Sequence, residues 1–239
     1  MNSVRTVRFL DVSGHLRWHA ARVTSAQASL KDALRSVLGP AARVRGYKGT
    51  APTWRKMNTN GDCAVVNVQT ESFGTAQRLS CVLNLAVVPE PWLRWLRGQL
   101  GSRMPRSVTE YLGLYRDRLH SGGAVGDRGW WEVDGPESAA AAVTAMVEQL
   151  ELIAWPALDR MLMPDGMLDQ VRRGDLGYMK RASYKVFFAR AEALLIMDLG
   201  PSGRLDDRLR FALKHSIPSQ KDDAARFDAW VRDQARNGG

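Results

Sequence analysis

Two stretches in the first half of the chain alternate between apolar and polar side chains, at residues 62–69 and 78–88. A period of two is typical of strands that bury one face. A shorter stretch at 53–58 precedes them, and the turn sequence Asn60-Gly61-Asp62 separates it from the first of the two. Together the three stretches predict a small antiparallel sheet.

The two longer strands also predict a register. A loop centred on Phe73-Gly74 places Val66 opposite Cys81 and Val68 opposite Leu79. The residues expected on the buried face are Ala64, Val66, Val68, Leu79, Cys81, Leu83 and Leu85. The residues expected on the opposite face are Asn67, Gln69, Ser80 and Asn84, mixed with Val65 and Val82.

Apolar residues recur at spacings of three and four in much of the remaining chain, which predicts helices. The first helix is expected over 25–38, with Ser25 as its N-cap and Gly39-Pro40 as its end. A short helix containing Trp92 and Trp95 follows the sheet, then a helix over 108–119, a glycine-rich loop and a strand over 130–133. From Pro136 onward the pattern is helical, with a kink at Pro156. The later helices are expected over 166–173, 183–199, 205–215 and 221–236.

These elements predict an α+β fold, in which a small antiparallel sheet packs with helices and a helical C-terminal region follows. We expect residues 1–24 to be a basic, irregular N-terminal segment, residues 25–135 to be the α+β core, and residues 136–239 to be helices packed on that core. A chain of 239 residues is consistent with one structural domain of this kind.

Cysteine usage and hydropathy predict a soluble cytoplasmic protein. Cys63 and Cys81 fall on opposite faces of the expected sheet, so we expect two reduced core cysteines and no disulfide. The first twelve residues contain no apolar core of a signal peptide. The most apolar stretch, 186–199, contains Arg190, Glu192 and Asp198, so no membrane association is expected.

The formal net charge of +9 arises entirely in the first 60 residues, which hold 11 basic and 2 acidic side chains. Such asymmetry is typical of a surface for nucleic acid or for an acidic partner. A compositional origin is the alternative, because arginine outnumbers lysine 27 to 7 throughout the chain.

Motifs for catalysis, metals and cofactors are missing. His15 and His19 have the spacing of a metalloprotease motif, but the glutamate that acts as base is absent. The glycine-rich stretch 122–129 lacks the Gly-Lys-Ser/Thr ending of a phosphate loop, and no dinucleotide fingerprint or Gly-x-Ser-x-Gly elbow is present. We therefore predict no cofactor and no metal site, and leave the catalytic residues unassigned.

Four of the eight tryptophans, Trp92, Trp95, Trp130 and Trp131, fall in one zone beside several arginines. Core packing is the commoner role and is favoured for Trp92, Trp95 and Trp130. Neighbouring residues of a strand point to opposite faces, so Trp130 and Trp131 cannot both enter the same core. One of the two is expected in a second packing layer or available to a partner.

The sheet segments resemble the bacterial family of the domain of unknown function 4304. The residues that carry this resemblance are Gly46-Tyr47-Lys48, Trp54-Arg55-Lys56, Val65-Val66-Asn67-Val68-Gln69-Thr70, Leu79–Leu85 with Asn84, Tyr115-Arg116-Asp117-Arg118 and Trp130-Trp131-Glu132. It covers residues 30–135 and implies a fold and an intracellular bacterial setting. It implies no reaction, and Val68 departs from the bulky aromatic that the family usually places before the glutamine.

The amides Asn67, Gln69 and Asn84 share the polar face of two paired strands. Buried amides must be hydrogen-bonded, so they either connect the sheet to an adjacent segment or line a polar groove. The predicted partner- or ligand-binding residues are Asn67, Gln69, Asn84, Arg55, Arg118, Trp130 and Trp131.

Three functions remain open. The favoured one is a non-catalytic module that binds a protein partner or a ligand. The first alternative is an enzyme of small-molecule metabolism that uses Glu71, Glu132 or Tyr115 as acid or base. The second alternative is nucleic-acid binding through the basic first 60 residues. The sequence leaves the oligomeric state open.

Overall fold

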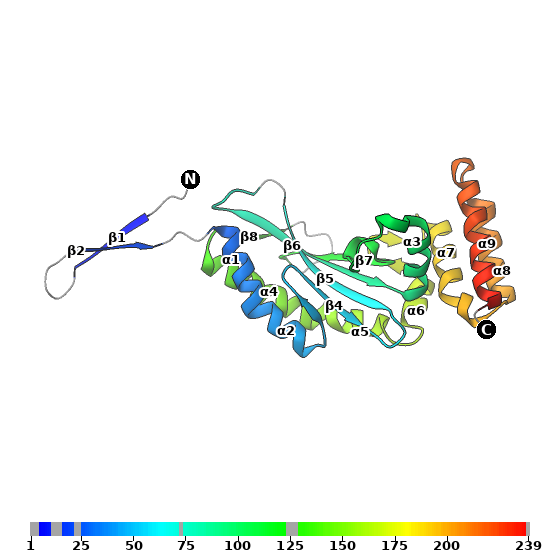
Figure 1. The fold of residues 1–239 in the computed structure, drawn as a ribbon, viewed down its shortest axis with the longest axis horizontal. Helices are drawn as coiled ribbons and strands as arrows, with labels where there is room; N and C mark the ends of the chain where they lie inside the picture. Colours follow the sequence, from blue (N-terminus) through cyan, green and yellow to red (C-terminus); the bar gives the residue numbers. More distant parts are fainter. Residues whose placement is uncertain (1–4, 11–15, 22–24, 72–73, 123–128, 238–239) are drawn as a thin grey trace.

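The computed structural model describes residues 5–10, 16–21, 25–71, 74–122 and 129–237. It has the predicted α+β architecture (Figure 1): a central antiparallel sheet with helices against it, and a helical C-terminal region at one end. No helix in the described part of the chain is long and apolar enough to cross a membrane.

The central sheet has six strands, and all of its pairings are antiparallel. Its order is β3-β4-β5-β6-β7, and β8 pairs with the part of β6 that β7 leaves free. The strands are β3 Lys48–Thr50, β4 Thr53–Met57, β5 Cys63–Thr70, β6 Leu79–Val88, β7 Tyr115–Leu119 and β8 Trp131–Val133. A two-stranded hairpin, β9 Asp175–Leu176 and β10 Met179–Lys180, lies beside β7 through a bridge between Gly177 and Arg116.

Nine α-helices occur among the described residues: α1 Ala26–Ala33, α2 Gly39–Val44, α3 Glu90–Leu100, α4 Pro136–Gln149, α5 Trp155–Met161, α6 Gly166–Arg173, α7 Lys185–Ile196, α8 Gly203–His215 and α9 Lys221–Asn237. Short 3-10 turns cover Gly101–Arg103, Glu110–Leu112, Met197–Leu199 and Pro218–Gln220. Helices α1, α4 and α5 contribute to the core on one face of the sheet, and α3 packs on the opposite face at one end.

The predicted faces of β5 and β6 are correct, but the predicted register is wrong by four residues. Val66 pairs with Leu85, not Cys81, and Val68 pairs with Leu83, not Leu79. The loop is centred further along the chain because Thr75 and Arg78 close a tight turn: the Thr75 amide donates to the Arg78 carbonyl (2.7 Å). A shift by an even number of residues leaves every side chain on its predicted face.

The first helix does not end at Gly39-Pro40 as predicted, because α1 continues through a π-helical turn, Leu34–Leu38, into α2. Proline lacks an amide hydrogen, and its ring clashes with the carbonyl four residues earlier in a regular helix. The wider π turn, in which the Gly39 amide bonds to the Leu34 carbonyl, accommodates this ring. A second π-helical turn, Leu150–Ala154, precedes Pro156 in the same way.

The helix predicted over 108–119 is also wrong, because this segment forms a short 3-10 turn and then β7. Gly113 lies between them, where a Cβ would stand 2.5 Å from the Tyr115 carbonyl oxygen. From Tyr115 onward, pairing with β6 satisfies the backbone of both strands. Arg116 and Arg118 then lie on the polar face of the sheet, while Tyr115 lies on the other.

The N-terminal segment 1–24, predicted to be irregular, contains the hairpin β1 Arg5–Leu10 and β2 Leu16–Ala21. Strand β1 contains the β-branched and aromatic residues Thr6, Val7 and Phe9, which favour extended backbone. The hairpin lies at the opposite end of the molecule from α8 and α9 (Figure 1). His15 lies outside the described residues, and His19 lies in β2.

Two further clusters adjoin the main core. Cys63, Val65, Ala86 and Val88 pack with α3 on the face of the sheet that points away from α1, α4 and α5, which we call the second face. Helices α7, α8 and α9 form their own core, into which α3 inserts the buried Trp95. The Trp95 ring meets the Phe227 ring edge-on, with centroids 5.0 Å apart. Helix α3 therefore joins the sheet to the C-terminal helices, which confirms the core role predicted for Trp95.

Candidate functional site

The second face of the sheet divides into an apolar half and a polar half. The apolar half carries Cys63, Val65, Ala86 and Val88 and is covered by α3 and the turn at Glu110–Leu112. The polar half, which we call the open sheet face, carries the outward side chains of β4 to β8 beyond that cover. Among the described residues, the other helices that contact the sheet pack on its opposite face.

Five side chains on the open sheet face form one hydrogen-bonded chain across four strands. We call it the amide ladder: Thr53 on β4, Asn67 and Gln69 on β5, Asn84 on β6 and Arg118 on β7. Asn67 Nδ2 donates to Thr53 Oγ1 (2.8 Å), and Asn84 Nδ2 donates to Gln69 Oε1 (2.8 Å) and Asn67 Oδ1 (3.4 Å). Arg118 Nε donates to Asn84 Oδ1 (2.9 Å).

Asn84 is the centre of the ladder. Its side chain is buried, and both its amide nitrogen and its carbonyl oxygen have hydrogen-bond partners. Asn84 has neither of the two roles predicted for the amides, because it bonds to side chains of the neighbouring strands β5 and β7 and not to an adjacent loop or helix. Exposure increases away from Asn84, to half-buried Asn67 and Arg118 and exposed Gln69.

Arg118 extends the ladder toward Trp130. Its guanidinium carbon lies 6.0 Å from the centroid of the half-buried Trp130 ring, within the range of a cation–π contact. Nη2 donates to Gln69 Oε1 (3.4 Å), while Nη1 has no hydrogen-bond partner among the described residues. A planar cation, an indole ring and an exposed amide therefore meet at one place on this face.

Trp131, the other half of the tandem pair, points the opposite way. It is only 5% exposed and belongs to the main core. The core role predicted for Trp130 is therefore wrong: Trp130 lies half-buried beside the amide ladder, and Trp131 lies in the core. Arg55 is on the face of the ladder but donates through Nε to the Val108 carbonyl, which holds the segment after α3 against β4.

The three residues predicted as acid or base in the enzyme alternative do not all converge. Hydrogen bonds from Ser80 Oγ (2.8 Å) and Arg78 Nε (2.9 Å) hold the pKa of Glu132 below its ordinary value. Burial and the neighbouring Asp117 raise the pKa of Tyr115, which lies on the other face of the sheet. Glu132 therefore stays ionised and Tyr115 stays protonated at neutral pH. The two side chains lie on opposite faces of the sheet. Glu71 is half-buried just after the end of β5.

The two cysteines are free and buried, as predicted. Burial raises the pKa of the Cys63 thiol to about 11 and that of Cys81 to about 12. Both thiols are therefore protonated at neutral pH, in the form that is the poorer nucleophile.

Sequence reasoning missed Thr53 and Arg116. Thr53 lies two residues before Arg55 in the strand predicted over 53–58, so the period of two already placed it on the same face as Arg55. Arg116 was missed because residues two apart on the helix expected over 108–119 lie on opposite faces, so nothing grouped Arg116 with Arg118. It pairs with Ala86 on the second face of the sheet, next to Arg118.

The basic side chains of the first 60 residues are partly neutralised. Arg45 pairs with Glu151, Lys56 Nζ lies 2.8 Å from Asp159 Oδ1, and Arg35 pairs with Asp32. Glu151 and Asp159 come from the helical region that follows the core. In the folded protein, acidic side chains from distant parts of the chain therefore offset some of the positive charge of the first 60 residues.

Asn84→Ala is expected to lower the free energy of unfolding by about 2 kcal/mol, because it removes the three bonds of a buried amide and leaves its partners short of theirs. Urea unfolding monitored by circular dichroism measures the change. Thr70→Ala is the control: its side chain is exposed at the end of β5 and makes no hydrogen bond with the residues that the structure describes, so we expect a change below about 0.5 kcal/mol. Equal effects of the two substitutions would contradict a structural role for Asn84.

Residues 38–160 match the family model described as Domain of unknown function (DUF4304). The match covers more than half of the chain, so the protein belongs to this family. The resemblance found over residues 30–135 is confirmed, and the match ends within α5. It contains the whole amide ladder and leaves α6 to α9 outside. No curated protein and no solved structure matches the chain.

Proposed function

We propose that this member of the family is a non-catalytic binding protein whose open sheet face docks an acidic segment of another protein. The observation that carries the proposal is the amide ladder, a pre-organised row of hydrogen-bonding groups that ends at the exposed Gln69 and the half-buried Arg118. The ladder is built by the part of the chain that defines the family.

The chemistry of the ladder favours recognition over catalysis. Its groups are a hydroxyl, three primary amides and a guanidinium, and it contains no carboxylate, imidazole or thiol. General acid or base catalysis needs a group whose pKa lies near the working pH. Amides and guanidinium groups instead select partners by directed hydrogen bonds and charge.

The charges on this face support an acidic partner. Lys48, Arg116 and Arg118 make no ion pair within the part of the chain that the structure describes. Tryptophan and arginine, here Trp130 and Arg118, are also the residues that contribute most to binding free energy in protein interfaces. A carboxylate-rich segment can bond to the free guanidinium nitrogen and to the exposed amide of Gln69.

The test compares two labelled probes of equal charge by fluorescence anisotropy: a glutamate-rich peptide and a single-stranded oligonucleotide. The protein is expected to bind the peptide, and Arg116→Gln with Arg118→Gln is expected to weaken it at least tenfold, or about 1.4 kcal/mol. Glutamine at 118 keeps a donor for Asn84, so the fold is retained.

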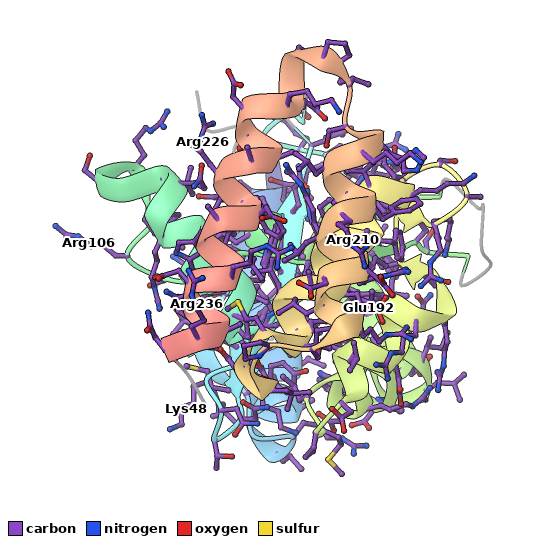
Figure 2. All side chains as sticks on the ribbon, turned by 90° about the vertical axis from the view of Figure 1, so that its right-hand side faces the viewer. Lys48, Arg106, Glu192, Arg210, Arg226 and Arg236 are labelled. Carbon is purple, nitrogen blue, oxygen red and sulfur yellow. The ribbon has the colours of Figure 1, made fainter. Side chains whose placement is uncertain are left out.

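The matched control is Arg210→Gln with Arg226→Gln, which removes the same charge from exposed positions on α8 and α9 (Figure 2). We expect this variant to bind like the unmodified protein. The proposal fails if both double variants weaken binding equally or if the peptide does not bind. Tighter binding of the oligonucleotide, with about one unit of log–log salt slope per phosphate, would favour nucleic-acid binding instead.

A further inference from the structure

A cleft opens at the C-terminal end of the molecule, outside the residues that match the family. Here the start of α7, the end of α8 and the start of α9 meet around a volume of about 960 Å³. We call it the helical cleft. Figure 2 looks onto this end of the molecule, with α8 and α9 side by side and Glu192 beside α8. Binding sites for small molecules usually have volumes of several hundred Å³.

Aromatic rings form much of the wall of the helical cleft. The Phe211 and His215 rings, one helical turn apart on α8, lie with centroids 4.3 Å apart at a tilt of 35°. Tyr184 and Phe187, at the start of α7, line the same cleft. The Phe187 ring is held edge-on against Trp92, with centroids 5.8 Å apart. Such walls suit a planar ring.

The polar groups of the cleft divide into paired and free ones. Arg190 Nη1 donates to Asp223 Oδ2 (2.8 Å), and its guanidinium lies 4.9 Å from the centroid of the Phe227 ring. Arg190 is thus anchored through one nitrogen, while its Nε and Nη2 are buried without a hydrogen-bond partner among the described residues. Lys185 is exposed and makes no ion pair with any residue that the structure describes. Among the described cationic side chains that line the cleft, Lys185 is the one without an ion pair.

A second hollow of about 320 Å³ adjoins the first and shares Ala182, Lys185 and Phe211 with it. Four cationic side chains line the two hollows, Arg181, Lys185, Arg190 and Arg208, against the acidic Glu192 and Asp223. Glu192 is buried and already bonded to Arg204 and Arg172. No acidic residue stands in the first turn of α7. The local balance is therefore positive.

We propose that the helical cleft binds a small organic anion with a planar ring, of the size of a mononucleotide. The ring lies against the Phe211–His215 pair, and the anionic group bonds to the ammonium of Lys185. This site is separate from the open sheet face and does not depend on the function proposed for it.

Isothermal titration calorimetry with AMP, adenosine and inorganic phosphate tests both halves of the proposal. AMP is expected to bind at least tenfold more tightly than either fragment, because only AMP meets the ring wall and the cation together. Lys185→Gln is expected to lower the affinity for AMP at least tenfold and to leave the affinity for adenosine unchanged. Phe211→Leu is expected to weaken AMP and adenosine but not phosphate.

The matched control is Lys214→Gln, which removes the same charge from an exposed position on α8 that does not line the cleft. It is expected to bind AMP like the unmodified protein. A second aromatic anion, 1-anilinonaphthalene-8-sulfonate, is titrated alongside. The proposal is overturned if neither AMP nor this probe binds, or if Lys185→Gln and Lys214→Gln weaken binding equally.

Discussion

Replacing Gly177 with alanine is expected to lower the free energy of unfolding by roughly 3 kcal/mol or more. Gly177 has a φ of +76°, in the left-handed region, and a Cβ there would stand 1.9 Å from the Arg116 carbonyl oxygen. That contact is with backbone, so no side-chain rotation relieves it. Relief requires the β9–β10 hairpin to move away from β7.

Movement of the hairpin would also break the hydrogen bond from the Tyr178 amide to the Arg116 carbonyl (2.9 Å). Because β7 carries Arg116 and Arg118, the effect is expected to reach the open sheet face. The measurement is urea unfolding of Gly177→Ala beside Gly203→Ala. A Cβ at Gly203, in the first turn of α8, meets nothing within 4 Å, so that control is expected to change stability by less than about 1 kcal/mol. Equal urea midpoints for Gly177→Ala and Gly203→Ala would show that the hairpin moves without loss of stability, and would contradict the prediction.

Glu192→Gln is expected to lower the free energy of unfolding at pH 7 by roughly 3 kcal/mol. The Glu192 side chain is 3% exposed, and Oε1 lies 2.8 Å from Arg204 Nε and 3.3 Å from Arg172 Nε. Arg208 Nη1 lies 3.8 Å from Oε2. The neutral amide leaves three guanidinium groups around a site without a compensating charge.

The effect depends on pH in a direction that follows from the pKa of Glu192. Burial raises this pKa, but the hydrogen bonds from Arg204 and Arg172 outweigh burial and leave it below the ordinary 4.5. The carboxylate therefore contributes stability that is present above pH 4.5 and is lost as the pH falls through the folded-state pKa. Acidification below pH 4.5 should narrow the difference between the unmodified protein and Glu192→Gln.

Urea unfolding at pH 7 and in acid measures both effects. Asp207→Asn is the matched control, since Asp207 pairs with Arg210 at an exposed position on α8 (2.6 Å) and is expected to contribute less than about 0.5 kcal/mol. A constant difference between Glu192→Gln and the unmodified protein across this pH range would contradict the role assigned to the carboxylate.

The polar face of the sheet was predictable without its register. Asn67, Gln69 and Asn84 were placed together although the predicted pairing was wrong by four residues. Side chains alternate along a strand, so the face of each depends only on the parity of its position. The position of the loop was not predictable in the same way, because the turn that closes at Thr75 and Arg78 depends on local hydrogen bonds.

Arg118 shows the limit of local patterns. Its segment was expected to be helical, yet strand pairing with β6 places it opposite Asn84. Gly39-Pro40 is a second case, since a π-helical turn lets the helix continue where proline and glycine normally end it. In the first case, hydrogen bonds to a distant strand outweigh the local preference for helix. In the second, the hydrogen bonds of the continuing helix outweigh the tendency of glycine and proline to end it.

The sequence by itself determined the fold class, the buried and polar faces of β5 and β6, the free cysteines and the family. These follow from periodicity and composition, which act over neighbouring residues. Only the tertiary structure decided that Trp131 enters the core while Trp130 meets Arg118, and that Lys185, Phe211 and His215 surround one cleft. Such sites join residues from distant segments, and their geometry is set by packing that no local pattern contains.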